Sequence, residues 1–205
     1  MKRSLITDPV RAMIPRANRT VGSAAALIVL MILPSISCSA QIRGDIGGPH
    51  DPAHADRALD WCAVHLARKE LVAALSDCDH ALARDPKSAA ALSNRASVWI
   101  LAGEEKRALV DIEAALVLTP DDPSLYYNRG LANARLGDRR KAIEDYSEAI
   151  RRKPDFAVAY HNRGYEHERL GQAEAAIFDY RRALAITPEL KPAEEALRRN
   201  LSGRL

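Results

Sequence analysis

Two cysteines in the body of the chain, Cys62 and Cys78, are the side chains best able to form a covalent bond. The repeat pattern described below places them on facing positions of two antiparallel helices. A disulfide between them would close a loop near the 15-residue case, for which chain entropy adds about 3 kcal/mol. Exported proteins favour such a bond. The alternative is that both are small, buried packing residues, and the two interpretations stay open here.

A metal site would need His65 and His80 beside the cysteines. The resulting C-x2-H and C-x-H spacings do not resemble a structural zinc site. His161 and His167 share a predicted helix but fall on different stripes of it. The sequence shows no nucleophile motif, phosphate-binding loop or carboxylate pair in a recognisable context. We therefore expect no enzymatic activity, no metal and no cofactor.

Residues 1–40 have the features of an export signal. A basic start precedes an apolar centre at Ala24–Leu33 and a small-residue segment that ends at Ala40. This order predicts a secretory signal peptide cut after Ala40, since the apolar run is about half the ~20 residues of a spanning helix. Two alternatives are an uncleaved anchor over Val21–Ile36 and a lipidated Cys38, although Ser35 stands where lipoprotein signals usually have Leu.

All three interpretations of this leader place the body outside the cytoplasm, as a periplasmic or secreted protein. Membrane contact would come only through an uncleaved leader or a lipidated Cys38. The net charge of +3 arises from 30 basic and 27 acidic residues. Five of the basic and one of the acidic residues lie in 1–40, so the body carries 25 and 26. The basic surface expected of a nucleic-acid binder is missing from the body, and we expect no nucleic-acid partner.

The rest of the chain is organised by a repeat. Prolines recur at one constant interval at Pro86, Pro120, Pro154 and Pro188, and Pro52 extends the series backwards. A fixed period of this length predicts a solenoid of helical units. The units span 55–88, 89–122, 123–156 and 157–190. Before them, 41–54 predicts a flexible linker, because it has three Gly, two Pro and no helical period. After them, 191–205 predicts a capping helix.

Aligning the units on these prolines gives columns of similar residues. The first helix carries a small-residue column of Cys62, Ala96, Gly130 and Gly164. The second helix carries the alanine columns Ala74, Ala108, Ala142, Ala176 and Ala81, Ala115, Ala149, Ala183. A turn column reads Lys69, Gly103, Gly137 and Gly171. Small residues let helix axes approach closely, and Gly adopts turn conformations that other residues resist.

The order Asn-Arg-Gly, Leu-Gly, Ala-Ile-x-x-Tyr-x-x-Ala and Pro resembles the tetratricopeptide repeat. The resemblance covers 55–190, about two-thirds of the chain, and is weakest in 55–88. It implies an all-α fold, a right-handed solenoid of about four antiparallel helix pairs with the C-terminal capping helix. It also implies a non-enzymatic scaffold that binds a protein or peptide partner.

In this family a second stripe of the first helix lines the concave groove of the superhelix. Here this groove stripe comprises Ala90, Ser93, Asn94, Ser97, Ile100, Leu101, then Ser124, Tyr127, Asn128, Leu131, Ala134, Arg135, then Val158, His161, Asn162, Tyr165, Glu168 and Arg169. The resemblance implies that Asn94, Asn128 and Asn162 form a ladder that hydrogen-bonds a peptide backbone, although these amides can instead bond locally.

The same resemblance implies that Tyr127, Leu131, Arg135, His161, Tyr165 and Arg169 complete the peptide-binding groove. A buried tyrosine among them would act as a hot spot of about 2 kcal/mol. The stripe has no lysine, unlike the subfamily that clamps the terminal carboxylate of chaperone tails. The expected partner is an extended or helical segment of an envelope protein. The alternative is a structural module that assembles end to end through its terminal repeats, and the oligomeric state stays open.

Overall fold

The computed structural model describes residues 57–202, and within this range the chain forms helices joined by short turns. The predicted leader and the predicted linker lie outside the described residues. The helices are α3 (Ala58–Ala67), α4 (Leu71–Arg84), α5 (Ala89–Ala102), α6 (Glu105–Leu118), α7 (Pro123–Arg135), α8 (Arg139–Arg152), α9 (Ala157–Arg169), α10 (Ala173–Ile186) and α11 (Lys191–Ser202).

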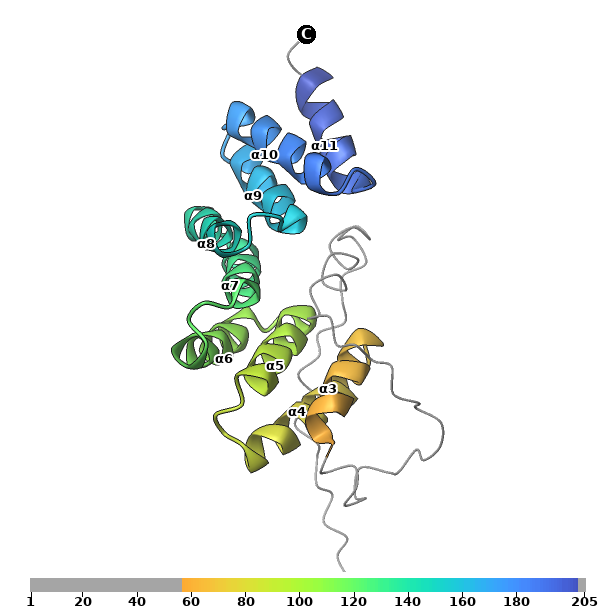
Figure 1. Ribbon diagram of the computed structural model, residues 1–205, viewed down its shortest axis with the longest axis vertical. Coiled ribbons are helices and arrows are strands. Elements are labelled where there is room, and N and C mark those ends of the chain that lie inside the picture. The colour runs from red at the N-terminus through yellow and green to blue at the C-terminus, as the bar shows by residue number, and fades with distance from the viewer. Residues whose placement is uncertain (1–56, 203–205) are drawn as a thin grey trace, which may run out of the picture.

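Successive helices pack as hairpins, α3 with α4, α5 with α6, α7 with α8 and α9 with α10. Each hairpin also packs on the next, and α11 packs on α10. Figure 1 shows the pairs stacked along the long axis from α3 and α4 to α11. The predicted all-α repeat solenoid is therefore confirmed. None of the helices described is long and apolar enough to cross a membrane.

The small-residue column lets the two helices of a hairpin touch. A Cβ added to Gly130 of α7 would lie 2.7 Å from Cε1 of Tyr146 on α8. The equivalent addition to Gly164 of α9 would lie 3.0 Å from Cε1 of Tyr180 on α10. Both tyrosine rings are buried and cannot move aside cheaply. The glycines are thus required by the large aromatic side chain opposite.

The turn column has the backbone conformation that the sequence predicts. Gly103, Gly137 and Gly171 have φ angles of 81°, 89° and 74°. Lys69 occupies the same place in the first repeat with φ of 60°, although its Cβ makes this region unfavourable. The first hairpin therefore keeps the shape of the others at a cost in backbone energy.

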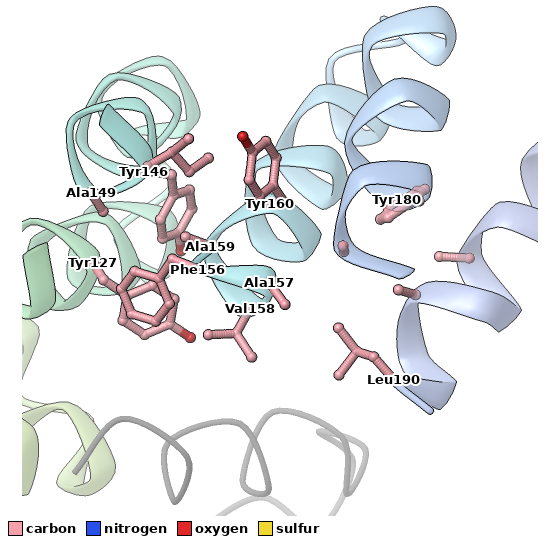
Figure 2. Close-up of a cluster of buried hydrophobic side chains, with 14 of the residues drawn as sticks. Tyr127, Tyr146, Ala149, Phe156, Ala157, Val158, Ala159, Tyr160, Tyr180 and Leu190 are labelled. Carbon is pink, nitrogen blue, oxygen red and sulfur yellow. The ribbon is translucent and has the colours of Figure 1, made fainter. Parts of the chain in front are cut away.

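The core is a row of side-chain clusters along the array. One cluster occupies the first hairpin, a second surrounds α5 and α6, and a third runs from α7 to α11. Trp99 contacts the first two clusters, and Leu131 contacts the second and third. Figure 2 shows the third cluster, in which the tilted rings of Tyr127 and Phe156 pack with centroids 5.1 Å apart. This continuity through shared residues is the way a solenoid buries its core.

A buried aspartate column joins the two helices of each hairpin, and the sequence analysis did not identify it. Asp77, Asp111, Asp145 and Asp179 recur once per repeat and are 1–5% exposed. In three repeats the partner is the arginine that follows the ladder asparagine, 16 residues earlier: Arg95 with Asp111, Arg129 with Asp145 and Arg163 with Asp179. Asn133 donates a second bond to Asp145. These pairs satisfy charges that burial would otherwise penalise.

The first hairpin uses a different cross-link. Trp61 stands where the other repeats have arginine, and His65 Nδ1 instead lies 2.6 Å from Asp77 Oδ2. The structure contains the predicted disulfide between Cys62 and Cys78, which are also 16 residues apart and fully buried. The covalent bond therefore joins α3 to α4 in the repeat that lacks the bidentate ion pair.

Candidate peptide-binding surface

Hydrogen bonds join the groove stripe of one repeat to that of the next. Asn128 Nδ2 on α7 donates to Ser97 Oγ on α5 at 3.3 Å. Asn162 Nδ2 on α9 donates to the hydroxyl of Tyr127 on α7 at 2.8 Å. Asn94 makes no side-chain hydrogen bond to another described residue. The stripes of α5, α7 and α9 thus form one continuous surface, and two of the three ladder amides already bond locally through one N–H.

Tyr127 differs from its expected place on the groove lining. Its side chain is 0% exposed, and its ring packs on Tyr146 and Phe156. Burial raises the pKa of its hydroxyl, which accepts from Asn162. The cause is Phe156, the residue just before α9, whose ring packs on that of Tyr127. Tyr127 supports the surface from beneath and is not part of its exposed lining.

The exposed part of the stripe lies on the third and fourth repeats. Tyr165 is 45% exposed, Arg135 and Arg169 are exposed, and Leu131 is half-buried because it also packs in the core. Tyr165 and Arg169 are four residues apart on α9 and so lie on the same face of that helix. An aromatic ring beside a cation is thus offered to solvent.

The charges of this surface are unevenly paired. Arg135 donates to the carbonyl of Ile100 and lies 3.7 Å from Glu105. Glu168 accepts from the hydroxyl of Tyr180 at 2.7 Å and from Arg199 of α11 at 3.1 Å. Arg169 forms no ion pair or hydrogen bond among the described residues. The carboxylates of Glu105 and Glu168 are therefore already paired, while Arg169 interacts only at longer range, with the buried Glu166.

The pKa of Glu168 reflects the hydrogen bonds that it accepts. Burial alone would raise its pKa, but the hydrogen bonds from Arg199 and Tyr180 outweigh burial and keep the pKa below the ordinary value. Glu168 therefore stays ionised and bonded near neutral pH. Arg199 was not identified from the sequence, although it lies one repeat length after Tyr165, in the same column. Continuing the repeat register into the last helix would have placed Arg199 in the groove stripe.

His161 lies on α9 with its ring 5.6 Å from that of Tyr180. It is 9% exposed, and its Nδ1 atom is buried without a hydrogen-bond partner. Burial lowers the pKa of His161 to about 4, with a smaller opposing contribution from Glu168. The imidazole is therefore neutral at pH 7.

This burial predicts a pH-dependent stability. The unfolded imidazole binds a proton below about pH 6.5, whereas the folded one does so only near pH 4. Between these values the unfolded state holds more protons, so the free energy of unfolding falls as pH falls. We expect a loss of about 2 kcal/mol between pH 7.5 and pH 5 relative to His161→Phe, measured by urea unfolding. The exposed His80→Phe variant is the control, and parallel profiles for wild type and His161→Phe would contradict the prediction.

The family of the chain follows from sequence comparison. Tetratricopeptide-repeat family models match residues 102–160 and 157–190. The chain is a tetratricopeptide-repeat protein. No curated protein matches its sequence. Proteins of this family are generally scaffolds for protein or peptide partners, and this tetratricopeptide array is a protein-interaction scaffold.

Solved structures share this tetratricopeptide fold. The MamA protein is 21% identical with a TM-score of 0.63, covering 73% of this chain and 82% of that one. TTC0263 from Thermus thermophilus is 19% identical with a TM-score of 0.63, covering 75% and 83%. The first repeat domain of Spaghetti (RPAP3), bound to HSP90 peptide SRMEEVD, is 26% identical with a TM-score of 0.55, covering 58% and 94%.

The arrangement has no feature of a catalytic or metal centre among the residues described. No group of three or more His, Cys, Asp or Glu side chains is placed to hold a metal ion in residues 57–202. Among the titratable groups of the surface, Glu168 and Arg199 are bonded to each other and His161 is buried and neutral, whereas Arg169 is exposed without an ion pair to another described residue. What this surface can offer a partner is an exposed ring, free cationic charge and half-buried apolar side chains.

Proposed function

We propose that the groove stripe of α7 and α9, with Arg199 of α11, binds an extended acidic segment of a partner protein. The observation that carries this proposal is Arg169, which is exposed beside the half-exposed ring of Tyr165 and has no ion pair with any residue of 57–202. A carboxylate of the partner would give Arg169 its missing ion pair. The Tyr165 ring would supply contact area at low entropic cost. The array itself performs no chemistry and acts as an adaptor.

A related structure supports a peptide as the ligand class. The peptide bound to the Spaghetti domain, SRMEEVD, contains two Glu and a terminal Asp. The groove stripe of the present chain has no lysine and would hold carboxylates through arginine, which forms planar bidentate pairs. A different acidic sequence is therefore expected here, with an apolar or aromatic residue that contacts Tyr165 and Leu131.

The predicted export signal indicates where in the cell the partner would be found. A basic start, a short apolar run and small residues before Ala40 are typical of export, so the partner would be an envelope or secreted protein. The body carries almost equal numbers of basic and acidic residues, which argues against nucleic acid as the partner. Contact with a membrane would come through the leader or through Cys38.

Selection from a random peptide library displayed on phage would test the ligand class directly. We expect peptides recovered on the wild-type protein to be enriched in Asp and Glu and to lose at least tenfold in affinity for Arg169→Glu. Tyr165→Ala should weaken the same peptides by a similar factor. The matched control is Arg140→Glu, which makes the same charge change at an exposed position of a second helix, α8.

Three results would contradict the proposal or limit it. Recovered peptides without an acidic excess, or with unchanged affinity for Arg169→Glu and Tyr165→Ala, would place binding elsewhere. Equal losses for Arg169→Glu and Arg140→Glu would show a general charge effect. Circular dichroism of each variant would confirm that the helices remain folded.

A further inference from the structure

The outer face of α6 is an apolar stripe. Val110 and Val117 are 66% and 83% exposed, and Ala114 between them is exposed as well. Leu118, at the end of the helix, is 38% exposed. Residues at these spacings lie on one side of a helix. Figure 1 places α6 at the outer edge of the stack, so this stripe is separate from the groove stripe on the first helices.

The other second helices do not repeat this pattern. At the positions of Val110, Ala114 and Val117, α8 has Glu144, Glu148 and Arg151, and α10 has Phe178, Arg182 and Ala185. A solvent-facing helix surface is normally polar or charged, as it is on α8. Two highly exposed valines on one stripe therefore indicate that α6 contacts something.

The charges at the two ends of the stripe indicate which molecule contacts it. Lys106 continues the stripe at its N-terminal end. Asp121 lies in the turn beyond the C-terminal end, with 95% of its side chain exposed and Oδ1 3.9 Å from Nε of Arg152. A helix is stabilised by acidic groups at its N-terminus and basic groups at its C-terminus. This pair has the opposite arrangement, so stabilisation of α6 itself does not account for it.

We propose that the stripe pairs antiparallel with the same stripe of a second copy of this chain. Centred on Ala114, the pairing sets Val110 against Leu118 of the second copy and brings Lys106 near its Asp121. A surface that is basic at one end and acidic at the other is complementary to itself only in this antiparallel orientation. The small side chain of Ala114 allows the two helices to approach at the two-fold axis.

The expected complex is a closed and weak dimer. A two-fold contact uses the same patch on both copies and stops at two, whereas end-to-end stacking of terminal repeats would continue to grow. A pair of 14-residue helices buries less than the ~800 Å² per partner of a standard interface. We therefore expect a dissociation constant in the micromolar to millimolar range. Dimerisation leaves the groove stripe free and does not depend on the proposed peptide binding.

Sedimentation equilibrium of the purified full chain, at concentrations up to about 1 mM, would test the pairing. We expect a monomer–dimer equilibrium whose dissociation constant rises at least tenfold in Val117→Glu, because the charge would be buried at the apolar contact. The matched control is Ala185→Glu, which introduces the same carboxylate at the same position of α10 and should leave the constant unchanged. A chain that stays monomeric, or a Val117→Glu dimer as stable as wild type, would overturn the proposal.

Exchanging the charges of Lys106 and Asp121 tests the antiparallel orientation of the two copies. Lys106→Glu and Asp121→Lys should each weaken the dimer about threefold to tenfold, since each sets like charges against one another twice per dimer. The double variant restores opposite charges and should return the dissociation constant to within about twofold of wild type. Failure of this rescue, or growth beyond a dimer, would reject antiparallel pairing through α6.

Discussion

Replacing Asp179 with alanine is expected to lower the free energy of unfolding by about 2–3 kcal/mol. Asp179 is 1% exposed and accepts from Arg163 through both carboxylate oxygens, at 2.7 and 2.9 Å. Its removal leaves the guanidinium without its partner in a mostly buried position. The cost falls at the low end for a buried pair because Arg163 keeps a bond to Ser147 and is 18% exposed. Urea unfolding followed by circular dichroism would measure it.

Two controls separate the buried pair from general charge effects. Lys141→Ala removes one partner of an exposed pair with Asp138 and should change stability by less than about 0.5 kcal/mol. The double replacement Arg163→Leu/Asp179→Leu removes both charges together and should cost less than Asp179→Ala alone. A double variant at least as unstable as the single one would show that the ion pair itself, and not the stranded arginine, carries the energy.

Removal of the disulfide is expected to destabilise the first repeat by about 3 kcal/mol, the chain-entropy value for a loop of this length. The effect should be local, because each repeat of a solenoid contacts only its neighbours. In Cys62→Ala/Cys78→Ala, hydrogen exchange should accelerate throughout α3 and α4 while α7 to α10 keep their protection. The first hairpin has Trp61 in place of the arginine that links the helices of the other three.

Reduction of the wild-type protein gives an independent check of the same bond. A reducing agent should accelerate exchange in α3 and α4 as the alanine variant does, and should have no further effect on that variant. Cys38 would be replaced by serine in every sample so that only one pair of thiols responds. Unchanged protection of α3 and α4 after verified reduction would show that packing around Cys62 and Cys78 suffices.

The constant period of the repeat was enough to predict the fold. Columns of small residues, turn glycines and prolines each reflect a local requirement that recurs in every unit, so comparing the units revealed helix pairs and their order. Gly130 and Gly164 illustrate this, since they stand in the small-residue column and face Tyr146 and Tyr180. The aspartate column was equally periodic. It was missed because a single sequence does not show that Asp111 or Asp145 is buried.

The candidate surface was harder to predict because exposure depends on the next repeat. Tyr127 and Tyr165 both belong to the groove stripe, yet Phe156 packs on the ring of the first, while Tyr165 remains 45% exposed. The hydrogen bonds of Asn128 and Asn162 cross between repeats and need the relative placement of two helices. Arg169 could be named from the stripe, but its lack of a partner required the structure.

The cross-links within the hairpins have a mechanical consequence. Each bond, covalent in the first hairpin and ionic in the other three, lies inside one repeat. Hydrogen bonds and ion pairs also cross the boundaries between repeats, as from Asn162 to Tyr127 and from Arg95 to Asp79. Under a stretching force all of these polar links can separate, whereas the covalent bond of the first hairpin cannot. The first hairpin should therefore be the last to open.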